Sequence, residues 1–215
     1  MKECGKNTFE RLQEANRKTI LEDARYAGKK AVLLQVIAAL NSANLTWALS
    51  CSGGLYFMGL VPEFGDLDII VSPTEYEKLK EVLTAIGAKL KPTVQKEKFL
   101  TKMYQQATMD GVEFDLFGQF WIRTFESEVK YELKKEDIQQ VSLTEDVSVP
   151  VLCVEVQYVL YSMMIGWQAT RRWKAEICGS YLQENGVSNR AALLEVYQQT
   201  PALPEFLREG ISKLL

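Results

Sequence analysis

The feature that most constrains this chain is a pair of glycines followed at a fixed distance by two alternating carboxylates. Ser52, Gly53 and Gly54 follow an apolar run, and Asp66 and Asp68 open a hydrophobic segment after eleven further residues. In a β-strand, residues i and i+2 face the same side, so the two carboxylates project together while the apolar residues face a core. The spacing predicts a sheet with an acidic spot beside a strand-to-helix turn.

A second acidic strand is expected nearby. Asp110 and Gly111 form a two-residue hairpin signal, and the segment that follows places Glu113 and Asp115 on one face. If this strand neighbours the strand at 66–71, three or four carboxylates converge on one spot, and such a cluster repels itself strongly without a cation. Mg²⁺ is the expected occupant because it takes oxygen ligands and is often completed by substrate phosphates.

The glycine turn suits a phosphate. Backbone N–H groups at a helix N-terminus favour an anion, and glycine lets the backbone approach it closely. An ordinary turn with Ser52 as the helix cap explains the same residues equally well, and the turn is neither a P-loop nor a Gly-x-Gly-x-x-Gly turn. An Asp-x-Asp pair alone is commonly solvated. The joint order of the glycines and two acidic strands favours a metal-dependent enzyme that acts on a nucleoside triphosphate.

The composition excludes several kinds of chemistry. The 215 residues contain no histidine, which removes Ser-His-Asp and Cys-His catalysis and histidine metal sites. A net charge of −3 gives no overall basic field, so a nucleic acid partner is not expected. We see no signal peptide and no apolar run of the ~18 residues that a membrane span requires. The four cysteines lack metal-ligand spacing and indicate reduced thiols, so we expect a cytoplasmic protein.

Hydrophobic periodicity predicts an α+β fold: a small mixed, largely antiparallel sheet backed by helices, with a helical C-terminal region. The order of elements changes from mixed to helical near residue 147, so we expect an α/β domain with N-terminal helices over 1–147 and a helical region over 148–215. The predicted helices span 7–26, 29–43, 53–59, 73–86, 154–167, 171–184, 188–199 and 203–214. The predicted strands span 46–51, 66–71, 96–108, 112–119, 129–133 and 138–143.

At these residues the sequence resembles the nucleotidyltransferase superfamily, whose fold is shared with DNA polymerase beta. The superfamily pattern is a hydrophobic residue, Gly, then Gly or Ser, a spacer, Asp-hydrophobic-Asp, and later a third acid between hydrophobic residues. Residues 51–54, 66–68 and 114–116 match it. The chain is most similar to small bacterial lincosamide and aminoglycoside nucleotidyltransferases and to the abortive-infection or toxin–antitoxin nucleotidyltransferases.

The resemblance implies a site and a reaction. Asp66 and Asp68 would bind the Mg²⁺ ions that carry the triphosphate. Asp115 would complete a second metal site and help to deprotonate the acceptor hydroxyl, and residues 52–54 would hold the β- and γ-phosphates. The reaction would move a nucleoside monophosphate onto a hydroxyl and release pyrophosphate, mostly by positioning and charge neutralisation.

Two further segments bear on this interpretation. The loop Pro62–Gly65 lacks the Arg that many relatives carry shortly before the Asp-x-Asp strand. Arg171, Arg172 and Lys174 form the densest basic spot, which could meet a triphosphate or, as we favour, form the solvated face of an amphipathic helix. Tyr161, on the preceding predicted helix, is expected to pack on the sheet, with an acceptor or base pocket as the alternative.

We therefore expect an Mg²⁺-dependent nucleotidyltransferase that uses ATP and a hydroxyl acceptor, such as an antibiotic or another small molecule, or else a protein. A second hypothesis is a degenerate nucleotidyltransferase-fold module that binds a partner, in the manner of an antitoxin, without activity. A third is a glycosyltransferase whose Asp-x-Asp pair holds Mn²⁺ and a sugar nucleotide. That third hypothesis gives Gly53, Gly54 and Asp115 no role.

Overall fold

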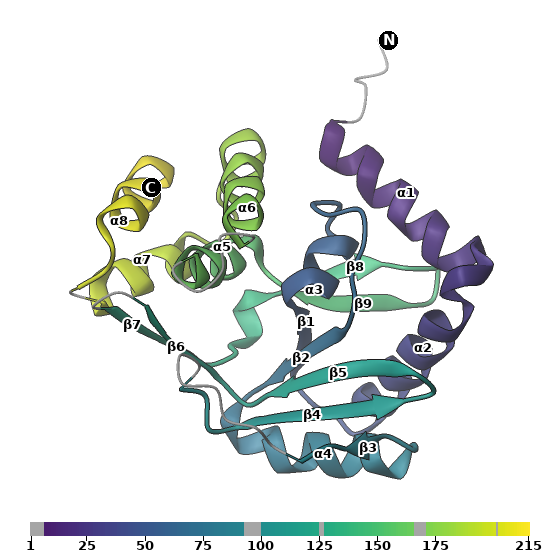
Figure 1. Cartoon of the computed structure of the whole chain (residues 1–215). Coiled ribbons are helices and arrows are strands. Elements are labelled where there is room, and N and C mark those ends of the chain that lie inside the picture. The colour runs from purple at the N-terminus through teal and green to yellow at the C-terminus, as the bar shows by residue number, and fades with distance from the viewer. Residues whose placement is uncertain (1–6, 93–99, 125–126, 166–170, 201) are drawn as a thin grey trace, which may run out of the picture.

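The computed structural model of the protein describes residues 7–92, 100–124, 127–165, 171–200 and 202–215. Within these residues the centre of the fold is a seven-stranded sheet in the order β3-β4-β5-β2-β1-β9-β8 (Figure 1). The pairs β2–β5 and β1–β9 are parallel and the other neighbours are antiparallel, which confirms the predicted α+β class with a mixed, largely antiparallel sheet. The strands of this sheet are β1 (Trp47–Ser50), β2 (Leu67–Val71), β3 (Lys89–Leu90), β4 (Tyr104–Met109), β5 (Val112–Phe117), β8 (Ile138–Ser142) and β9 (Ser148–Leu152).

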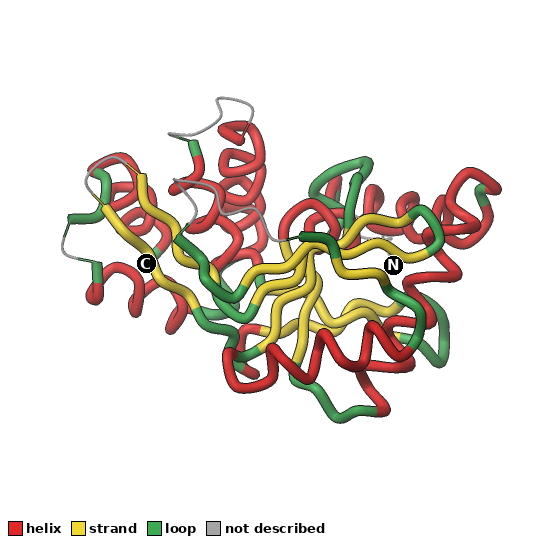
Figure 2. Tube along the Cα trace, turned by 60° about the horizontal axis from the view of Figure 1, so that its bottom comes forward, coloured by secondary structure: helices red, strands yellow, loops and turns green. Residues whose placement is uncertain are grey.

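Helices lie on both sides of the strands (Figure 2). In Figure 1, the four C-terminal helices gather at one end of the molecule, beside a separate two-stranded hairpin of β6 (Phe120–Thr124) and β7 (Ser127–Tyr131). None of the described helices is both long and apolar enough to cross a bilayer. The α-helices are α1 (Thr8–Glu22), α2 (Ala27–Ser42), α3 (Cys51–Phe57), α4 (Tyr76–Ala85), α5 (Val154–Met164), α6 (Arg172–Asn185), α7 (Arg190–Gln199) and α8 (Glu205–Leu214).

The strands that carry the acidic residues are among the most deeply buried. Every residue of β1 and β2 is buried. In β5, Val112, Phe114 and Leu116 are buried while Glu113 is exposed. Each fully buried large apolar side chain contributes roughly 1.5–3 kcal/mol of stability, so the core fixes which way the acidic residues of the same strands can point.

The hairpin predicted at Asp110 and Gly111 is confirmed. Both residues have positive φ, 49° and 79°, as a type I′ turn requires. This turn sets the register of β4 against β5, so that Gln106 lies opposite Asp115. The turn at Asp110 and Gly111, which is visible in the sequence, thereby places Gln106 beside the predicted site residue Asp115.

Several predicted boundaries differ from the structure. The strand predicted over 96–108 begins only at Tyr104, and residues 96–99 lie outside the described residues. Helix α3 begins two residues before the predicted 53–59. Strand β6 was not predicted, because its aromatic residues follow β5 after only Gly118 and Gln119 and carry no separate turn signal.

The division near residue 147 stays a prediction. Strand β9, which follows this point, pairs with β1 and β8 in the main sheet, so the helical region proper starts with α5. The thiols of Cys51, Cys153 and Cys178 are free, and Cys4 lies outside the described residues.

We expect Gly54→Ala to destabilise the fold. A Cβ at residue 54 would lie 2.8 Å from the Leu49 carbonyl oxygen and 3.0 Å from Gln157 Nε2, so α3 could not keep its close contact with β1. Overpacking of this kind costs about 1–3 kcal/mol of unfolding free energy, measurable by equilibrium urea denaturation.

Gly53→Ala is the matched control. Its Cβ would meet nothing closer than 3.7 Å, and alanine is the better helix former. Equal loss of stability in the two variants would contradict the packing role of Gly54.

Candidate active site

Three carboxylates meet at the start of β2 and the middle of β5. Asp68 and Asp115 are register partners in the parallel pair, and Asp66 immediately precedes β2. Each residue offers one carboxylate oxygen, and these oxygens lie within 4.8 Å of one another. We call Asp66, Asp68 and Asp115 the carboxylate cluster. The structure thus brings together the three acids that the sequence singled out as metal ligands.

Strand β4 holds Asp115 in place. Tyr104 Oη and Gln106 Nε2 each donate a hydrogen bond of 3.0 Å to Asp115 Oδ1. Glu113, two residues earlier, forms an exposed ion pair with Lys91 and does not join the cluster. Among the described residues, the cluster therefore has three carboxylates. The contribution of β4 was not predicted, because Tyr104 and Gln106 reach the site only through the hairpin register.

The carboxylate cluster is electrostatically costly without a cation. Burial raises the pKa of Asp68 well above its usual range, and the charges of Asp66 and Asp115 raise it further. Arg171 and Lys174 oppose this shift. Three oxygen donors at this spacing suit a small divalent cation such as Mg²⁺, which would remove the repulsion. The residues present therefore fit the metal that the sequence predicted.

Two cations from the helical region face the same space. Arg171 and Lys174 lie over the ring of Tyr161, with Cζ and Nζ 6.0 and 5.3 Å from its centroid. Burial and the nearby Arg171 charge lower the pKa of Lys174, while the nearby Cys51, Asp68 and Asp66 raise it. Of the basic residues predicted to form a solvated face, Arg172 is exposed, whereas Arg171 and Lys174 are half-buried against the Tyr161 ring. Sequence spacing could not show which helix face would turn toward the sheet.

Tyr161 is buried as predicted, but its hydroxyl has a distinctive setting. It is 1% exposed, and its Oη has no hydrogen-bond partner among the described residues. Burial, and then the proximity of Cys51 and Asp68, raise the pKa of this phenol well above its usual range. A buried hydroxyl without a partner is costly, so a ligand in this space would satisfy it.

The glycine turn starts beside the carboxylate cluster. Ser50 is the register partner of Asp68, and its Oγ donates a 3.3 Å hydrogen bond to the Asp68 carbonyl oxygen. Cys51 follows with a φ of 51°, a left-handed conformation that is uncommon for a residue with a side chain, and turns the chain into α3. Ser52 and Gly53 therefore occupy the first turn of α3, next to the acidic strand.

The loop that leads into the cluster is anchored by an aromatic residue. Phe64 is buried with its ring centroid 4.8 Å from that of Tyr56. Lys29 Nζ donates a 2.8 Å hydrogen bond to the Phe64 carbonyl oxygen and lies 4.7 Å from the Phe64 ring centroid. The segment that lacks the Arg of many relatives thus supplies a rigid approach to Asp66.

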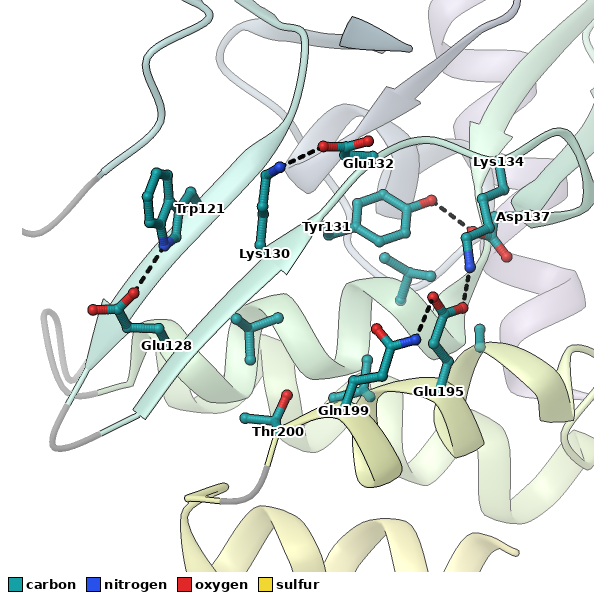
Figure 3. Close-up of a pocket in the computed structure, with 14 residues that line it drawn as sticks. Trp121, Glu128, Lys130, Tyr131, Glu132, Lys134, Asp137, Glu195, Gln199 and Thr200 are labelled. Carbon is teal, nitrogen blue, oxygen red and sulfur yellow. Dashed lines mark hydrogen bonds and ion pairs between the residues drawn. The ribbon is translucent and has the colours of Figure 1, made fainter.

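A hollow lies between the β6–β7 hairpin and α7 (Figure 3). Its volume is about 500 Å³, and Figure 3 shows polar side chains that pair with one another around it, such as Lys134 with Glu195 and Tyr131 with Asp137. No member of the carboxylate cluster lines this hollow, so it is separate from the candidate active site.

The sequence matches the family model described as aminoglycoside-2''-adenylyltransferase over residues 32–178, which covers the glycine turn, the carboxylate cluster and both cations. The chain belongs to this family. It is a nucleotidyltransferase, and the predicted superfamily is confirmed. No curated protein matched the sequence.

Solved structures agree on the fold of this family member. A Thermotoga maritima protein described as a nucleotidyltransferase is 19% identical with a TM-score of 0.51, covering 72% of this chain and 92% of its own. ANT(2'')-Ia in complex with adenylyl-2''-tobramycin is 12% identical with a TM-score of 0.52, covering 85% and 96%. At these identities the likeness shows the fold, and the roles of individual site residues stay predictions.

We expect Asp68→Asn to stabilise the nucleotidyltransferase at pH 7 in the absence of divalent cations. A carboxyl whose pKa is higher in the folded than in the unfolded protein contributes stability that is lost as the pH rises through the folded-state pKa. At pH 7 the raised pKa of Asp68 therefore lowers the unfolding free energy, by ~1.4 kcal/mol for each pKa unit of upward shift. Asparagine removes the titrating carboxyl, and urea denaturation in EDTA measures the gain.

Glu113→Gln serves as the control, because Glu113 is exposed and paired with Lys91. It should leave the unfolding free energy nearly unchanged. A loss of stability in Asp68→Asn under metal-free conditions would mean that the cluster is not repulsive.

Proposed function

We propose that this nucleotidyltransferase moves the adenylyl group of ATP onto a hydroxyl of an aminoglycoside antibiotic, with Mg²⁺ bound at the carboxylate cluster. The observation that carries the proposal is the carboxylate cluster, whose three oxygens lie within 4.8 Å of one another, with Arg171 and Lys174 near enough to lower the pKa of Asp68. Acids for a metal and cations for phosphates are both needed to bind a metal–triphosphate complex.

The three acids divide two roles in this proposal. Asp66 and Asp68 would hold the cation with Asp115 completing the site, and the bound cation would neutralise charge on the triphosphate and polarise the α-phosphate. Asp115 Oδ1 already accepts two hydrogen bonds from β4, so its Oδ2 is the oxygen that takes the proton of the acceptor hydroxyl. The acceptor oxygen then forms a bond to the α-phosphorus, the bond to the bridging oxygen breaks, and pyrophosphate leaves.

The triphosphate would lie between α3 and α6. Lys174 and Arg171 would pair with its oxygens, and the unpartnered Tyr161 hydroxyl would donate to one of them. Ser52 and the Gly53 amide would contact the β- and γ-phosphates at the first turn of α3. A Cβ at residue 54 would clash with β1, so Gly54 contributes by allowing α3 to lie this close to the sheet.

The acceptor class rests on the family, whose model is described as an aminoglycoside-2''-adenylyltransferase. A cytoplasmic location agrees with the use of ATP and with the free thiols. The alternative of an inactive partner-binding module is disfavoured by the complete carboxylate cluster and by the cations that face it. A lincosamide or a protein acceptor remains an outcome of the test below.

A transfer assay tests the proposal. The purified protein is incubated with Mg²⁺, each of the four nucleoside triphosphates, and a panel of aminoglycosides, a lincosamide and a protein mixture. Pyrophosphate release and the product mass are measured. ATP with an aminoglycoside should give a product heavier by one adenylyl group, while Asp115→Asn should bind MgATP and give no product. Transfer only to another acceptor would overturn the acceptor class, and no transfer by a protein that binds MgATP would overturn the enzyme proposal.

Lys174→Met should raise the KM for ATP ~10- to 100-fold, since a hydrogen bond to a charged group contributes about 1.5–3 kcal/mol. Arg172→Met removes a neighbouring cation that is exposed, and its KM should stay within about twofold of wild type. Steady-state kinetics at saturating acceptor compare the two. Equal effects would indicate a general charge effect and would argue against a phosphate contact by Lys174.

A further inference from the structure

Helix α1 lies outside residues 32–178, which carry the family match, yet it contacts both sides of the active site. We name these sides by their charge. The acidic wall is α3, the loop 58–66 and strand β2, which together carry Asp66 and Asp68, and the basic wall is Arg171 with α6. In Figure 1, α1 and α6 stand on opposite sides of α3.

Asn16 ties α1 to the acidic wall. Its Nδ2 donates hydrogen bonds of 2.7 Å to the Tyr56 carbonyl oxygen and 2.8 Å to the Val61 carbonyl oxygen, and Tyr56 Oη donates to the Asn16 carbonyl oxygen at 2.7 Å. Asn16 is only 4% exposed. Asparagine is a poor residue for a helix interior, so its place in the middle of α1 is explained by these tertiary bonds.

The backbone of α1 also sits directly on the end of α3. Gly59 has a φ of 73°, and a Cβ there would lie 2.3 Å from the Phe9 carbonyl oxygen and 2.6 Å from the Gln13 nitrogen. Gln13 Nε2 donates a 3.0 Å hydrogen bond to the Phe57 carbonyl oxygen. The N-terminal half of α1 is therefore fixed to the segment that leads to the metal carboxylates.

The N-terminus of α1 reaches the basic wall. The Phe9 ring packs edge-on against Tyr181 of α6, with centroids 5.1 Å apart. Asn7, which caps α1, donates a 2.8 Å hydrogen bond from Nδ2 to Asn185 Oδ1. Lys174, Tyr181 and Asn185 share one face of α6, because their spacings of seven and four residues each return to the same side of a helix.

From these contacts we propose that α1 is a brace that sets the spacing between the acidic and basic walls, with Asn7, Phe9 and Asn16 as positioning residues. Lys174 lies on the same face of α6 as Tyr181 and Asn185, the two residues through which α1 contacts this helix. A change in the α1–α6 contact therefore changes how well the two walls close on a metal–triphosphate complex. This consequence rests on the proposed function, whereas the contact itself does not.

Two charge pairs at the α1–α6 contact test the brace. Asn7→Asp with Asn185→Asp places like charges across the contact, and Asn7→Asp with Asn185→Lys places opposite charges there. Aspartate at residue 7 keeps the side-chain oxygen that caps α1 in both variants, so the two variants differ only in the charge at residue 185. The readouts are amide hydrogen exchange over 171–178 and the Kd for Mg²⁺ with a non-hydrolysable ATP analogue.

The like-charge pair should speed exchange at the start of α6 and weaken analogue binding ~3- to 10-fold relative to the opposite-charge pair, which should stay within about twofold of wild type. The difference should shrink in 1 M salt. Equal exchange in the two pairs would overturn the brace, as would different exchange with equal Kd. If the wild type binds no analogue, the proposed function fails, and the exchange comparison still decides whether α1 holds α6.

A second pair of variants separates positioning from general stability. Phe9→Ala and Ile20→Ala each remove a buried apolar side chain from α1, but only Phe9 has a ring contact with α6. Phe9→Ala should weaken analogue binding while Ile20→Ala leaves the Kd unchanged, both measured well below their unfolding midpoints. Equal effects of the two variants on Kd would overturn the proposal.

Discussion

Repulsion among three converging carboxylates is the constraint on which the rest of the structure depends. Asp68 is buried beside its register partner Asp115, and its pKa is raised by burial and by both neighbouring acids. Buried like charges are tolerated when a cation joins them or when opposite charges face them. The fold meets both conditions. The carboxylate oxygens of the cluster can bind a cation, and the basic side chains of Arg171 and Lys174 lie near them. Around this spot, β1 and β2 are wholly buried, so the acids are fixed by core packing.

The two charges of the site come from two parts of the chain. The central sheet supplies the acids, with β4 orienting Asp115, and the helices that follow supply Lys174, Arg171 and the buried Tyr161 hydroxyl. The overall charge of −3 does not reveal this local basic wall, because it sums the whole chain, whereas Arg171 and Lys174 lie close together in the sequence. A metal–triphosphate complex carries both signs and would join the two parts. Helix α1 ties them together from the outside.

The features of the site that could be predicted are those determined by residues close together in the sequence. The alternation of Asp66 and Asp68 and the Asp110-Gly111 turn each follow from strand and turn geometry within a few residues. The parallel pairing that sets Asp115 beside Asp68 is non-local, and the resemblance to a family, not periodicity, supported it. The half-buried positions of Arg171 and Lys174 did not follow from the sequence, because tertiary packing decides which face of a weakly amphipathic helix is covered. Strand β6 was missed because only Gly118 and Gln119 separate it from β5.

The central claim is that the carboxylate cluster is a divalent cation site that carries a nucleoside triphosphate. The most direct measurement is the anomalous difference density of a crystal grown with Mn²⁺ and a non-hydrolysable ATP analogue. The account predicts a peak within coordination distance of Asp66 and Asp68 and bonded to analogue phosphates, with Lys174 on the same phosphates. A well-occupied analogue with no Mn²⁺ at these carboxylates, or Mn²⁺ bound elsewhere, would contradict it.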